Sequence, residues 1–345
     1  MKVGIDISPL SSGHKVRGVG FYVKLLKDNI AELDKKNEYS FFEGNPPPNL
    51  DLVHYPYFDP FQITLPSHFS NKTMVTVHDL TPIVFGQHFP AGLMGKLRWA
   101  FQKKRLKRVD SILADSECSK KDIVKITGIS EEKIKVVYLA ANKIYKKIKL
   151  GSNASQVKKK FSLPDEFVLY VGDATWNKNL PKLIESIKKT SYKLVLVGKV
   201  WENTFETVSD NPWNEDLKKV LKEIDQDEQF IKLGFVSDED LAIVYNLATV
   251  FIMPSIYEGF GLPVLEAMSC GTPVITTRGG SLPEVAGQAG YYVDVEDVEN
   301  IREGINAMMT DKKLRDLFSK KSIEQSKKFS IKKMITDTVS SYASV

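Results

Sequence analysis

Short apolar runs along the chain alternate with longer stretches in which apolar residues recur every three or four positions. The short runs predict buried strands, and the longer periodic stretches predict amphipathic helices. Their regular alternation is typical of an α/β fold built on a parallel sheet. In the first half of the chain, strands are predicted at 3–7, 52–55, 74–78, 111–114 and 135–138, and helices near 20–33, 93–109 and 118–127.

The same alternation restarts in the second half. Strands are predicted at 167–171, 193–197, 231–233, 250–253, 274–276 and 291–293, and helices near 179–190, 214–225, 238–247, 262–269 and 297–309. Runs such as FVLYVG and KLVLVG are apolar almost throughout, so helices should cover both faces of the sheet. We therefore expect two doubly wound, Rossmann-like α/β domains. Ligands should bind beyond the carboxyl ends of the strands, in a cleft across which the domains face each other.

Residues 141–155 separate the two patterns. This segment is polar, rich in lysine and contains Gly151, features that favour an interdomain linker. The sequence thus predicts an N-terminal domain over 1–150 and a C-terminal domain that starts at 151.

The composition is that of an ordinary globular protein. The 345 residues are 42% hydrophobic and 26% charged, which excludes a disordered or collagen-like chain and suffices for two cores. Cys118 and Cys270 lie far apart in apolar surroundings, so we expect small buried side chains in a reducing compartment. No run is long enough to span a membrane, and Asp6 interrupts the apolar N-terminus where a secretory signal would lie. We expect a cytoplasmic protein and leave binding to a membrane surface open.

The charge is distributed unevenly. Residues 1–160 carry 27 Lys and Arg against 15 Asp and Glu, whereas residues 161–345 carry 21 against 28. The segment 96–108, KLRWAFQKKRLKR, has seven basic residues and no acidic one. An apolar stripe of Leu93, Leu97, Ala100 and Phe101, with Trp99 beside it, makes the 93–109 helix a candidate for an anionic membrane surface. A domain helix with a solvated basic face is the alternative. Nucleic acid is a poorer partner, because the aromatic residues are not interleaved as a stacking platform.

The most informative stretch is 255–271, SIYEGFGLPVLEAMSCG. A strand should end in a loop that holds Glu258 and two glycines, and a helix should then begin with Pro263 in its first turn. The free N–H groups of a helix start suit a diphosphate, and the carboxylates of Glu258 and Glu266 suit the hydroxyls of two sugar rings. The alternative makes Glu258 a solvated loop residue and Glu266 a surface residue of the helix.

This stretch resembles the Glu-x7-Glu motif of the family-four retaining glycosyltransferases, which have the GT-B fold. The resemblance extends over nearly the whole chain. It includes YVGDATWNKNL, VTVHDLTP, GIDISPLSSGHKVRGVGFYV and ADSECSKKDI. The closing KKFSIKKMITDTVSSY is also similar, which implies that 329–345 form a C-terminal helix returning to the N-terminal domain and that the donor domain ends at 328.

The resemblance implies a role for each matching residue. Glu258 would contact the hydroxyls of the donor sugar, Glu266 the ribose, and Lys178 the diphosphate as it leaves. His78 would lie near the reacting carbon and the 6-hydroxyl of the donor sugar. His78, Glu258 and Lys178 are thus the expected catalytic residues. The remaining donor contacts would be the backbone of Gly259, Phe260, Gly261 and Leu262 along the sugar and phosphates, Gly18, Val19 and Gly20 on phosphate, and Phe235 and Val236 against the base.

Several of these residues have simpler interpretations when taken alone. His78 could be a strand-end histidine bonded to neighbouring backbone, Gly18 and Gly20 could mark an ordinary turn, and Lys178 could be a surface lysine. The chain also departs from the family at the phosphate site, since Asn177 precedes Lys178 where arginine is frequent, and Asp173 stands where some members are basic. Either one phosphate cation is missing or Arg278 takes its place.

No metal or other cofactor is expected. Without a metal, lysine and helix N–H groups must meet the charge of the leaving group. Asp225 and Asp227 have the spacing of a divalent-cation site, but their polar surroundings favour a solvated turn. His54 and His78 end strands without a nearby Cys or further His to complete a zinc site.

These patterns predict a metal-independent hexosyltransferase. The resemblance implies transfer from a nucleotide diphosphate sugar, with GDP-mannose as the first expectation and a UDP-sugar as the second, to a hydroxyl of a glycan or lipid-linked acceptor in surface polysaccharide or glycoconjugate assembly. It also implies retention of configuration by front-side attack. A nucleotide-sugar epimerase and a non-catalytic glycan- or membrane-binding protein remain alternatives. A nicotinamide dehydrogenase lacks its glycine fingerprint here.

Overall fold

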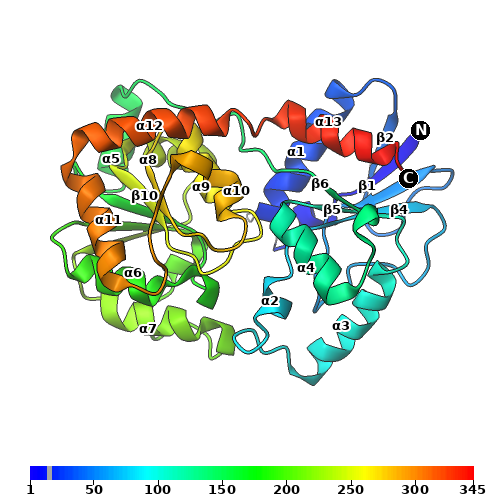
Figure 1. Ribbon diagram of the computed structural model, residues 1–345, viewed down its shortest axis with the longest axis horizontal. Helices are drawn as coiled ribbons and strands as arrows, with labels where there is room; N and C mark the ends of the chain where they lie inside the picture. The colour runs from blue at the N-terminus through cyan, green and yellow to red at the C-terminus, as the bar shows by residue number, and fades with distance from the viewer. Residues whose placement is uncertain (14–17) are drawn as a thin grey trace. The chain divides into compact units, whose positions relative to one another are not determined.

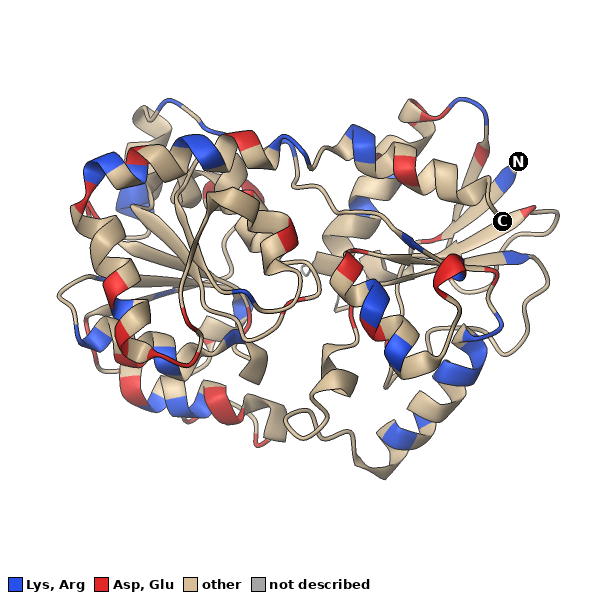
Figure 2. Ribbon diagram, viewed as in Figure 1, with Lys and Arg blue, Asp and Glu red and all other residues tan. Residues whose placement is uncertain are grey.

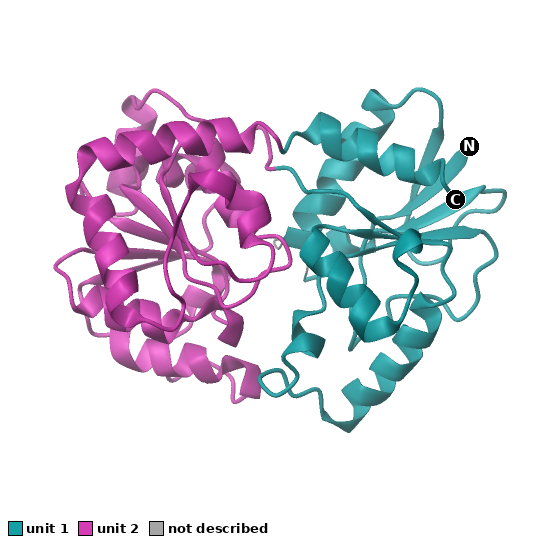
Figure 3. Ribbon diagram, viewed as in Figure 1, with its two compact units in different colours: residues 1–140, 329–345 teal, residues 141–328 magenta. Residues whose placement is uncertain are grey.

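The computed structural model describes residues 1–13 and 18–345 and divides into two compact units. Unit 1 comprises Met1–Ala140 and Phe329–Val345, and unit 2 comprises Ala141–Lys328 (Figures 1 and 3). Each unit is built on one six-stranded sheet in which every pair of neighbouring strands is parallel. The expectation of two doubly wound α/β halves is therefore confirmed.

The sheet of unit 1 has the order β2-β1-β3-β4-β5-β6. Its strands are β1 (Lys2–Asp6), β2 (Glu38–Phe42), β3 (Leu52–Tyr55), β4 (Lys72–Val77), β5 (Ser111–Ala114) and β6 (Ile134–Val136). The helices are α1 (Gly18–Leu33), α2 (Thr81–Val84), α3 (Gly92–Leu106), α4 (Glu117–Thr127) and α13 (Ile331–Tyr342), with short 3-10 turns η1 (Ser8–Ser11) and η2 (Glu131–Lys133). Strand β2 was not predicted, because it is an edge strand whose exposed and half-buried positions alternate.

The sheet of unit 2 has the order β12-β11-β10-β7-β8-β9. Its strands are β7 (Val168–Val171), β8 (Leu194–Val197), β9 (Phe230–Gly234), β10 (Val250–Met253), β11 (Val274–Thr276) and β12 (Gly290–Tyr292). The helices are α5 (Ser152–Lys160), α6 (Leu180–Lys188), α7 (Glu215–Ile224), α8 (Asp238–Leu247), α9 (Leu262–Ser269), α10 (Leu282–Ala286), α11 (Val298–Thr310) and α12 (Lys312–Ser326). Four 3-10 turns complete the unit: η3 (Trp176–Lys178), η4 (Lys199–Glu202), η5 (Pro212–Asn214) and η6 (Gly287–Ala289).

The central strands of unit 2 are buried on both faces. Every residue of β7, β8 and β10 is buried, as expected for strands covered by helices on either side. One helical layer contains α6, α7 and α11, and the other contains α5, α8, α9 and α10 (Figure 1). Each fully buried Leu or Ile side chain, such as Leu183 or Ile187 of α6, contributes about 1.5–3 kcal/mol. Strand β8 lies on one side of β7, and the chain later returns to place β10 on the other side of β7. A topological switch point therefore lies between β7 and β10.

Residues 141–155 do not form a free linker. The structure places 141–150 in unit 2, earlier than the boundary at 150 that composition suggested, and α5 begins at Ser152. The Ile148 N–H donates to Asn246 Oδ1 at 3.0 Å, and the Tyr145 hydroxyl donates to Asp238 Oδ1 at 3.2 Å. The composition of this segment is polar because of its lysines, but Tyr145 and Ile148 between them donate hydrogen bonds to side chains of α8.

Helix α13 belongs to unit 1 although its sequence follows unit 2. It packs along α1, and the Tyr342 hydroxyl lies 2.8 Å from His54 Nδ1. The other ring nitrogen of His54 lies 2.8 Å from Thr76 Oγ1, which is 3.1 Å from the Tyr22 hydroxyl. This fully buried polar chain fixes α13 and α1 to the centre of the sheet.

Two smaller findings concern the sequence expectations. Cys270 is buried as expected, whereas Cys118 is only half-buried in the first turn of α4. Among the described residues, no helix has the length and apolar character needed to cross a membrane.

Tyr342→Phe should destabilise unit 1. The substitution leaves one nitrogen of the buried His54 without its partner, which costs about 1–3 kcal/mol. Calorimetric unfolding should show a lower Tm for the unit 1 transition, while Tyr39→Phe, whose hydroxyl bonds to the half-buried Asp34, should have a smaller effect. Equal effects of the two substitutions would contradict the anchoring role of Tyr342.

Candidate functional site

The loop after β10 leads into α9 as the sequence predicted. Gly261 begins the helix with a φ of +90°, and Pro263 lies in the first turn. A Cβ at Gly261 would lie 2.9 Å from Leu282 Cδ2 and would require a strained backbone, so this position needs glycine. The N–H groups of the first turn of α9 therefore lie directly beyond the carboxyl end of β10.

Lys178 and Glu258 form an ion pair between two neighbouring loops. Lys178 closes η3 after β7, and its Nζ lies 2.7 and 2.9 Å from the two carboxylate oxygens of Glu258 after β10. The side chains are only 17% and 10% exposed, and the Ser255 hydroxyl donates to Glu258 at 2.6 Å. The pair therefore lies at the switch point of the sheet, and Glu258 is not the solvated loop residue of the alternative interpretation.

Asn177 connects the same two loops. Its amide Nδ2 donates to the Tyr257 carbonyl at 2.9 Å, and its carbonyl accepts from the Ile256 N–H at 2.7 Å. The Thr175 hydroxyl holds the Asn177 amide oxygen at 2.8 Å. Asn177 is thus a buried, neutral residue that joins the two loops. It adds no positive charge at a position where arginine is frequent in the resembling sequences.

A third loop supports Glu258 from behind. A Cβ at Gly279 would lie 2.2 Å from the Ile256 carbonyl oxygen, and a Cβ at Gly280 would lie 2.3 Å from that of Glu258. Backbone can approach this closely only where side chains are absent. The N–H and hydroxyl of Ser281 donate to the Glu258 carbonyl at 3.0 and 3.1 Å. The run RGGS after β11 supplies these residues, but nothing in its local spacing predicts that it supports Glu258.

Arg278 lies on this third loop. Its guanidinium stacks on the ring of Tyr292 at 4.3 Å from the centroid, and the side chain is exposed. Asp173, the other departure from the resembling sequences, is exposed beyond β7, and its carbonyl accepts the Tyr170 hydroxyl at 2.6 Å.

Glu266 is buried inside unit 2, so it is not a surface residue of its helix. Its Oε2 accepts a hydrogen bond from the Tyr245 hydroxyl at 2.9 Å. Burial, partly opposed by this hydrogen bond, raises the pKa of Glu266 to about 8. At neutral pH the carboxyl is therefore mostly protonated, and it can donate as well as accept hydrogen bonds.

The other expected donor contacts of unit 2 lie on two loops. Gly259 and Phe260 are buried and Leu262 is half-buried at the start of α9. Beyond β9, Phe235 is 53% exposed whereas Val236 is buried. The Phe235 N–H donates to the Glu202 carboxylate at 3.2 Å, which fixes the backbone next to the exposed ring.

In unit 1, His78 directly follows β4. Its Nδ1 lies 2.6 Å from Asp115 Oδ2 and its Nε2 lies 3.1 Å from the Pro56 carbonyl oxygen. Burial alone would lower the pKa of His78, but the charge and hydrogen bond of Asp115 outweigh it and raise the pKa above its ordinary value. Asp115 lies in the ADSECSKKDI motif, but no local spacing links it to His78, so their contact could not be predicted.

The expected phosphate contacts of unit 1 lie at the start of α1. Gly18 is exposed, Val19 half-buried and Gly20 buried in its first turn. Residues 14–17 of the same motif lie outside the described residues.

The candidates for a metal site find other partners. Asp225 pairs with Lys232 and accepts the Phe205 N–H at 2.9 Å, while Asp227 accepts the Gln229 N–H at 2.9 Å. His54 is engaged with Tyr342 and Thr76. Within the described parts of the chain, no three His, Cys, Asp or Glu residues come together as a metal site.

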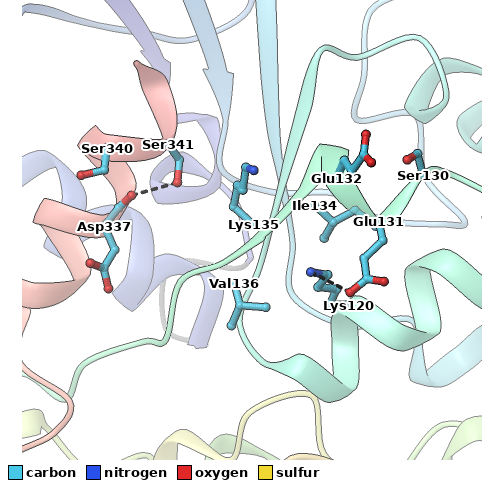
Figure 4. Close-up of a pocket in the computed structure, with 10 residues that line it drawn as sticks. All are labelled: Lys120, Ser130, Glu131, Glu132, Ile134, Lys135, Val136, Asp337, Ser340 and Ser341. Carbon is cyan, nitrogen blue, oxygen red and sulfur yellow. Dashed lines mark hydrogen bonds and ion pairs between the residues drawn. The ribbon is translucent and has the colours of Figure 1, made fainter. Parts of the chain in front are cut away.

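A polar groove of about 730 Å³ lies elsewhere on unit 1, along α4, β6 and α13 (Figure 4). It contains none of the predicted site residues, and a pair between Lys120 and Glu131 crosses part of it. The groove is open, and most of its lining residues are polar or charged, with Ile134 and Val136 as the apolar exceptions, unlike most small-molecule sites. We do not assign the nucleotide to it.

Glu266→Gln should stabilise unit 2 in a pH-dependent way. The unfolded carboxyl ionises near pH 4.5 and the folded one near pH 8, so the wild type loses stability as pH rises through this window. Glutamine mimics the protonated acid, and the gain at pH 8 should be on the order of a few kcal/mol. Calorimetry should show a larger rise in Tm at pH 8 than at pH 5, with the exposed Glu303→Gln as control. Equal shifts at both pH values would contradict a protonated Glu266.

Comparisons with known proteins identify the family of the chain. The family model described as glycosyl transferases group 1 matches residues 152–325, and the model of glycosyltransferase family 4 matches 34–142. The chain is 31% identical over 304 residues to O-antigen chain mannosyltransferase B of Escherichia coli, covering 85% of this chain and 75% of the relative. It is 28% identical to the serotype-specific mannosyltransferase WbdA of Escherichia coli over 84% of this chain, and the match spans 34% of WbdA.

Solved structures share the whole architecture. Sucrose-phosphate synthase from Thermosynechococcus elongatus matches with a TM-score of 0.76 and 18% identity, covering 100% of this chain and 98% of that one. Anabaena HepE in complex with UDP-glucose matches with a TM-score of 0.75 and 16% identity, covering 100% of both chains. Structural similarity at this sequence identity shows only the GT-B fold. The family model and the relative of 31% identity show membership of the family. The chain belongs to the group 1 glycosyltransferases, the family that its Glu-x7-Glu motif resembles.

Proposed function

We propose that this glycosyltransferase moves a mannosyl residue from GDP-mannose to a hydroxyl of a glycan or lipid-linked acceptor, with retention of configuration, in surface polysaccharide assembly. The observation that carries the proposal is the Lys178–Glu258 pair beside the start of α9. This arrangement puts one cation, one carboxylate and the start of α9 at the switch point of unit 2. The sugar and the pathway are proposed because two of the most similar relatives are mannosyltransferases of O-antigen or serotype-specific type.

The chemistry needs charge stabilisation on the leaving group. The bond from the anomeric carbon to the diphosphate oxygen breaks, and a bond to the acceptor oxygen forms on the same face. The acceptor proton passes to the departing diphosphate. Lys178 and the N–H groups of α9 would stabilise the negative charge that develops on the diphosphate without a metal ion. Glu258 would accept hydrogen bonds from the sugar hydroxyls and orient the ring.

The ion pair has a further consequence for donor binding. Lys178 and Glu258 neutralise each other in the unliganded protein, and both are largely buried. A bound diphosphate would compete with Glu258 for Lys178, while sugar hydroxyls would compensate Glu258. A donor that carries both groups should therefore bind better than either part alone.

The remaining site residues enter the proposal through the sequence resemblance. It assigns the ribose to Glu266, the base to the loop of Phe235 and Val236, and phosphate contacts to Gly18, Val19 and Gly20. It assigns the reacting end of the donor sugar to His78. A UDP-sugar remains the second candidate donor, and a nucleotide-sugar epimerase would differ by converting its substrate without an acceptor.

A thermal-shift panel of GDP-mannose, UDP-glucose and ADP-glucose tests the donor. A ligand at 100 times its dissociation constant stabilises the native protein by about 2.7 kcal/mol, so GDP-mannose should raise Tm by several degrees and exceed the other two. Lys178→Met should abolish the shift and lower kcat/KM by about 100-fold or more. Lys182→Met, which removes an exposed lysine of α6, is the matched control.

Because the pair is buried, Lys178→Met also lowers apo stability, and the double variant Lys178→Met/Glu258→Gln should restore part of it without restoring binding. Equal shifts with all sugar nucleotides, or none with any, would contradict the proposed donor. Turnover of GDP-mannose to another sugar nucleotide without acceptor would favour the epimerase. Activity that is lost in EDTA and restored by magnesium would contradict the metal-independent route.

We also propose that α3 lies on an anionic membrane, on the cytoplasmic face where the nucleotide sugar would be used. Its apolar side chains Leu93, Met94, Leu97 and Phe101 are between 48% and 77% exposed. The residues of α3 that are buried are Gly95, Gln102 and Leu106. Lys and Arg residues recur along the same helix (Figure 2). A helix of a water-exposed domain normally buries such a stripe, so the exposure supports an interfacial role.

Leu97→Asp should weaken binding to vesicles that contain phosphatidylglycerol. The substitution puts a charge in the apolar stripe and repels anionic lipid. Co-sedimentation should fall several-fold, while Leu317→Asp on α12, whose side chain is equally exposed at 48%, should bind like the wild type. Wild-type protein that stays in the supernatant at low salt would contradict membrane binding.

A further inference from the structure

We infer that Asp115 is a positioning residue that holds His78 as an imidazolium with both ring nitrogens bonded inside unit 1. The inference rests on the proposed function only in the part that concerns transfer, since His78 is the residue of unit 1 assigned to the reacting sugar. The two side chains follow neighbouring strands, β4 and β5, in which Val77 is paired with Ala114. His78 and Asp115 therefore leave the same edge of the sheet side by side.

The hydrogen-bond partners determine the protonation state of the ring. Nε2 faces the Pro56 carbonyl at 3.1 Å, and a carbonyl can only accept, so Nε2 must carry a hydrogen. Nδ1 faces Asp115 Oδ2 at 2.6 Å. Burial raises the pKa of Asp115, whereas the charge and hydrogen bond of His78 act to lower it, and we infer that the proton of the pair stays on the ring. The ionised carboxylate then also only accepts. An imidazole with a hydrogen on each nitrogen is cationic. Asp115 is 3% exposed, so its charge acts on the ring with little screening by water.

A second histidine in the same sheet shows what the carboxylate changes. His54 lies within the neighbouring strand β3 and is also buried, but its nitrogens face the hydroxyls of Tyr342 and Thr76. Burial, with a smaller contribution from the charge of His78, lowers the pKa of His54 to about 3. The two histidines differ mainly in their partners, since hydroxyls can serve a neutral ring whereas a carboxylate stabilises the cation.

Other groups around His78 act in the same direction or are neutral. Asp79 adds negative charge nearby, although its carboxylate is bonded to the Thr81 N–H at 2.8 Å. Tyr22 of α1 presents its ring edge-on to His78, with centroids 5.1 Å apart. From α4, the Ser119 hydroxyl donates to the His78 carbonyl at 2.9 Å. Asp115 is thus the group that both charges and orients the ring.

This state limits what His78 can do in transfer. Neither ring nitrogen can accept a proton, so the histidine is not a base in this state. The imidazolium supplies a fixed positive charge. Such a charge is better suited to stabilising a departing diphosphate than a sugar that carries positive charge in the transition state. Asp115 acts through His78 and does not itself contact substrate.

Imidazole nitrogen NMR on the 15N-labelled protein tests the assignment without any turnover. In the wild type at pH 6.5, both His78 nitrogens should show protonated-type shifts, while His54 should show one protonated and one unprotonated nitrogen. Asp115→Asn keeps an acceptor of similar shape but removes the charge, and it should weaken proton binding by His78 at least tenfold. Asp79→Asn is the matched control and should have a smaller effect. An unprotonated His78 nitrogen at pH 6.5 in the wild type, or unchanged titration in Asp115→Asn, would overturn the inference.

Kinetics separate a positioning role from a structural one. Asp115→Asn should lower kcat for transfer with little change in donor KM, and the lost activity should return partly as pH falls and His78 is protonated again. A decrease that is the same at every pH would count against the inference. If the wild type transfers no sugar but the NMR pattern is as expected, the proposed function fails and the assignment of Asp115 stands.

Discussion

The ion pair between Lys178 and Glu258 is the constraint around which the site of unit 2 is arranged. It joins the loops after β7 and β10, the two strands at which the winding of the sheet reverses. A charge pair that is so little exposed is costly unless its geometry is fixed, and Ser255 and the backbone supply that geometry. Gly279 and Gly280 let a third loop approach Glu258 from behind. The cation and the carboxylate are therefore in place before a donor binds. Charges that are preorganised in this way are effective because they need not reorganise during the reaction.

Unit 1 has a different strand order but also places its charged groups after neighbouring parallel strands. Its sheet is also parallel, and His78 and Asp115 leave the carboxyl ends of the neighbouring strands β4 and β5. In each unit, a positive and a negative side chain meet because two parallel strands end side by side. The fold thus converts residues that are far apart in sequence into buried, oppositely charged pairs at one edge of a sheet.

The strands and the motif of unit 2 could be predicted because their signals are local. The apolar runs of β7, β8 and β10 and the Glu-x7-Glu spacing need no knowledge of distant residues. Strand β2 escaped prediction because an edge strand alternates polar and apolar positions weakly. Asn177 and Asp115 escaped because their roles depend on partners that follow other strands, such as Tyr257 and His78. The apolar stripe of α3 was recognised, but whether it packs or is exposed is decided by the rest of the domain.

The central claim is most directly tested by an experimental structure of the protein with bound GDP. The account predicts that the diphosphate lies at the first turn of α9 and within hydrogen-bond distance of Lys178 Nζ, with Glu258 released from at least one of its two contacts with the lysine. A diphosphate bound elsewhere, or a Lys178–Glu258 pair unchanged by the nucleotide, would contradict it.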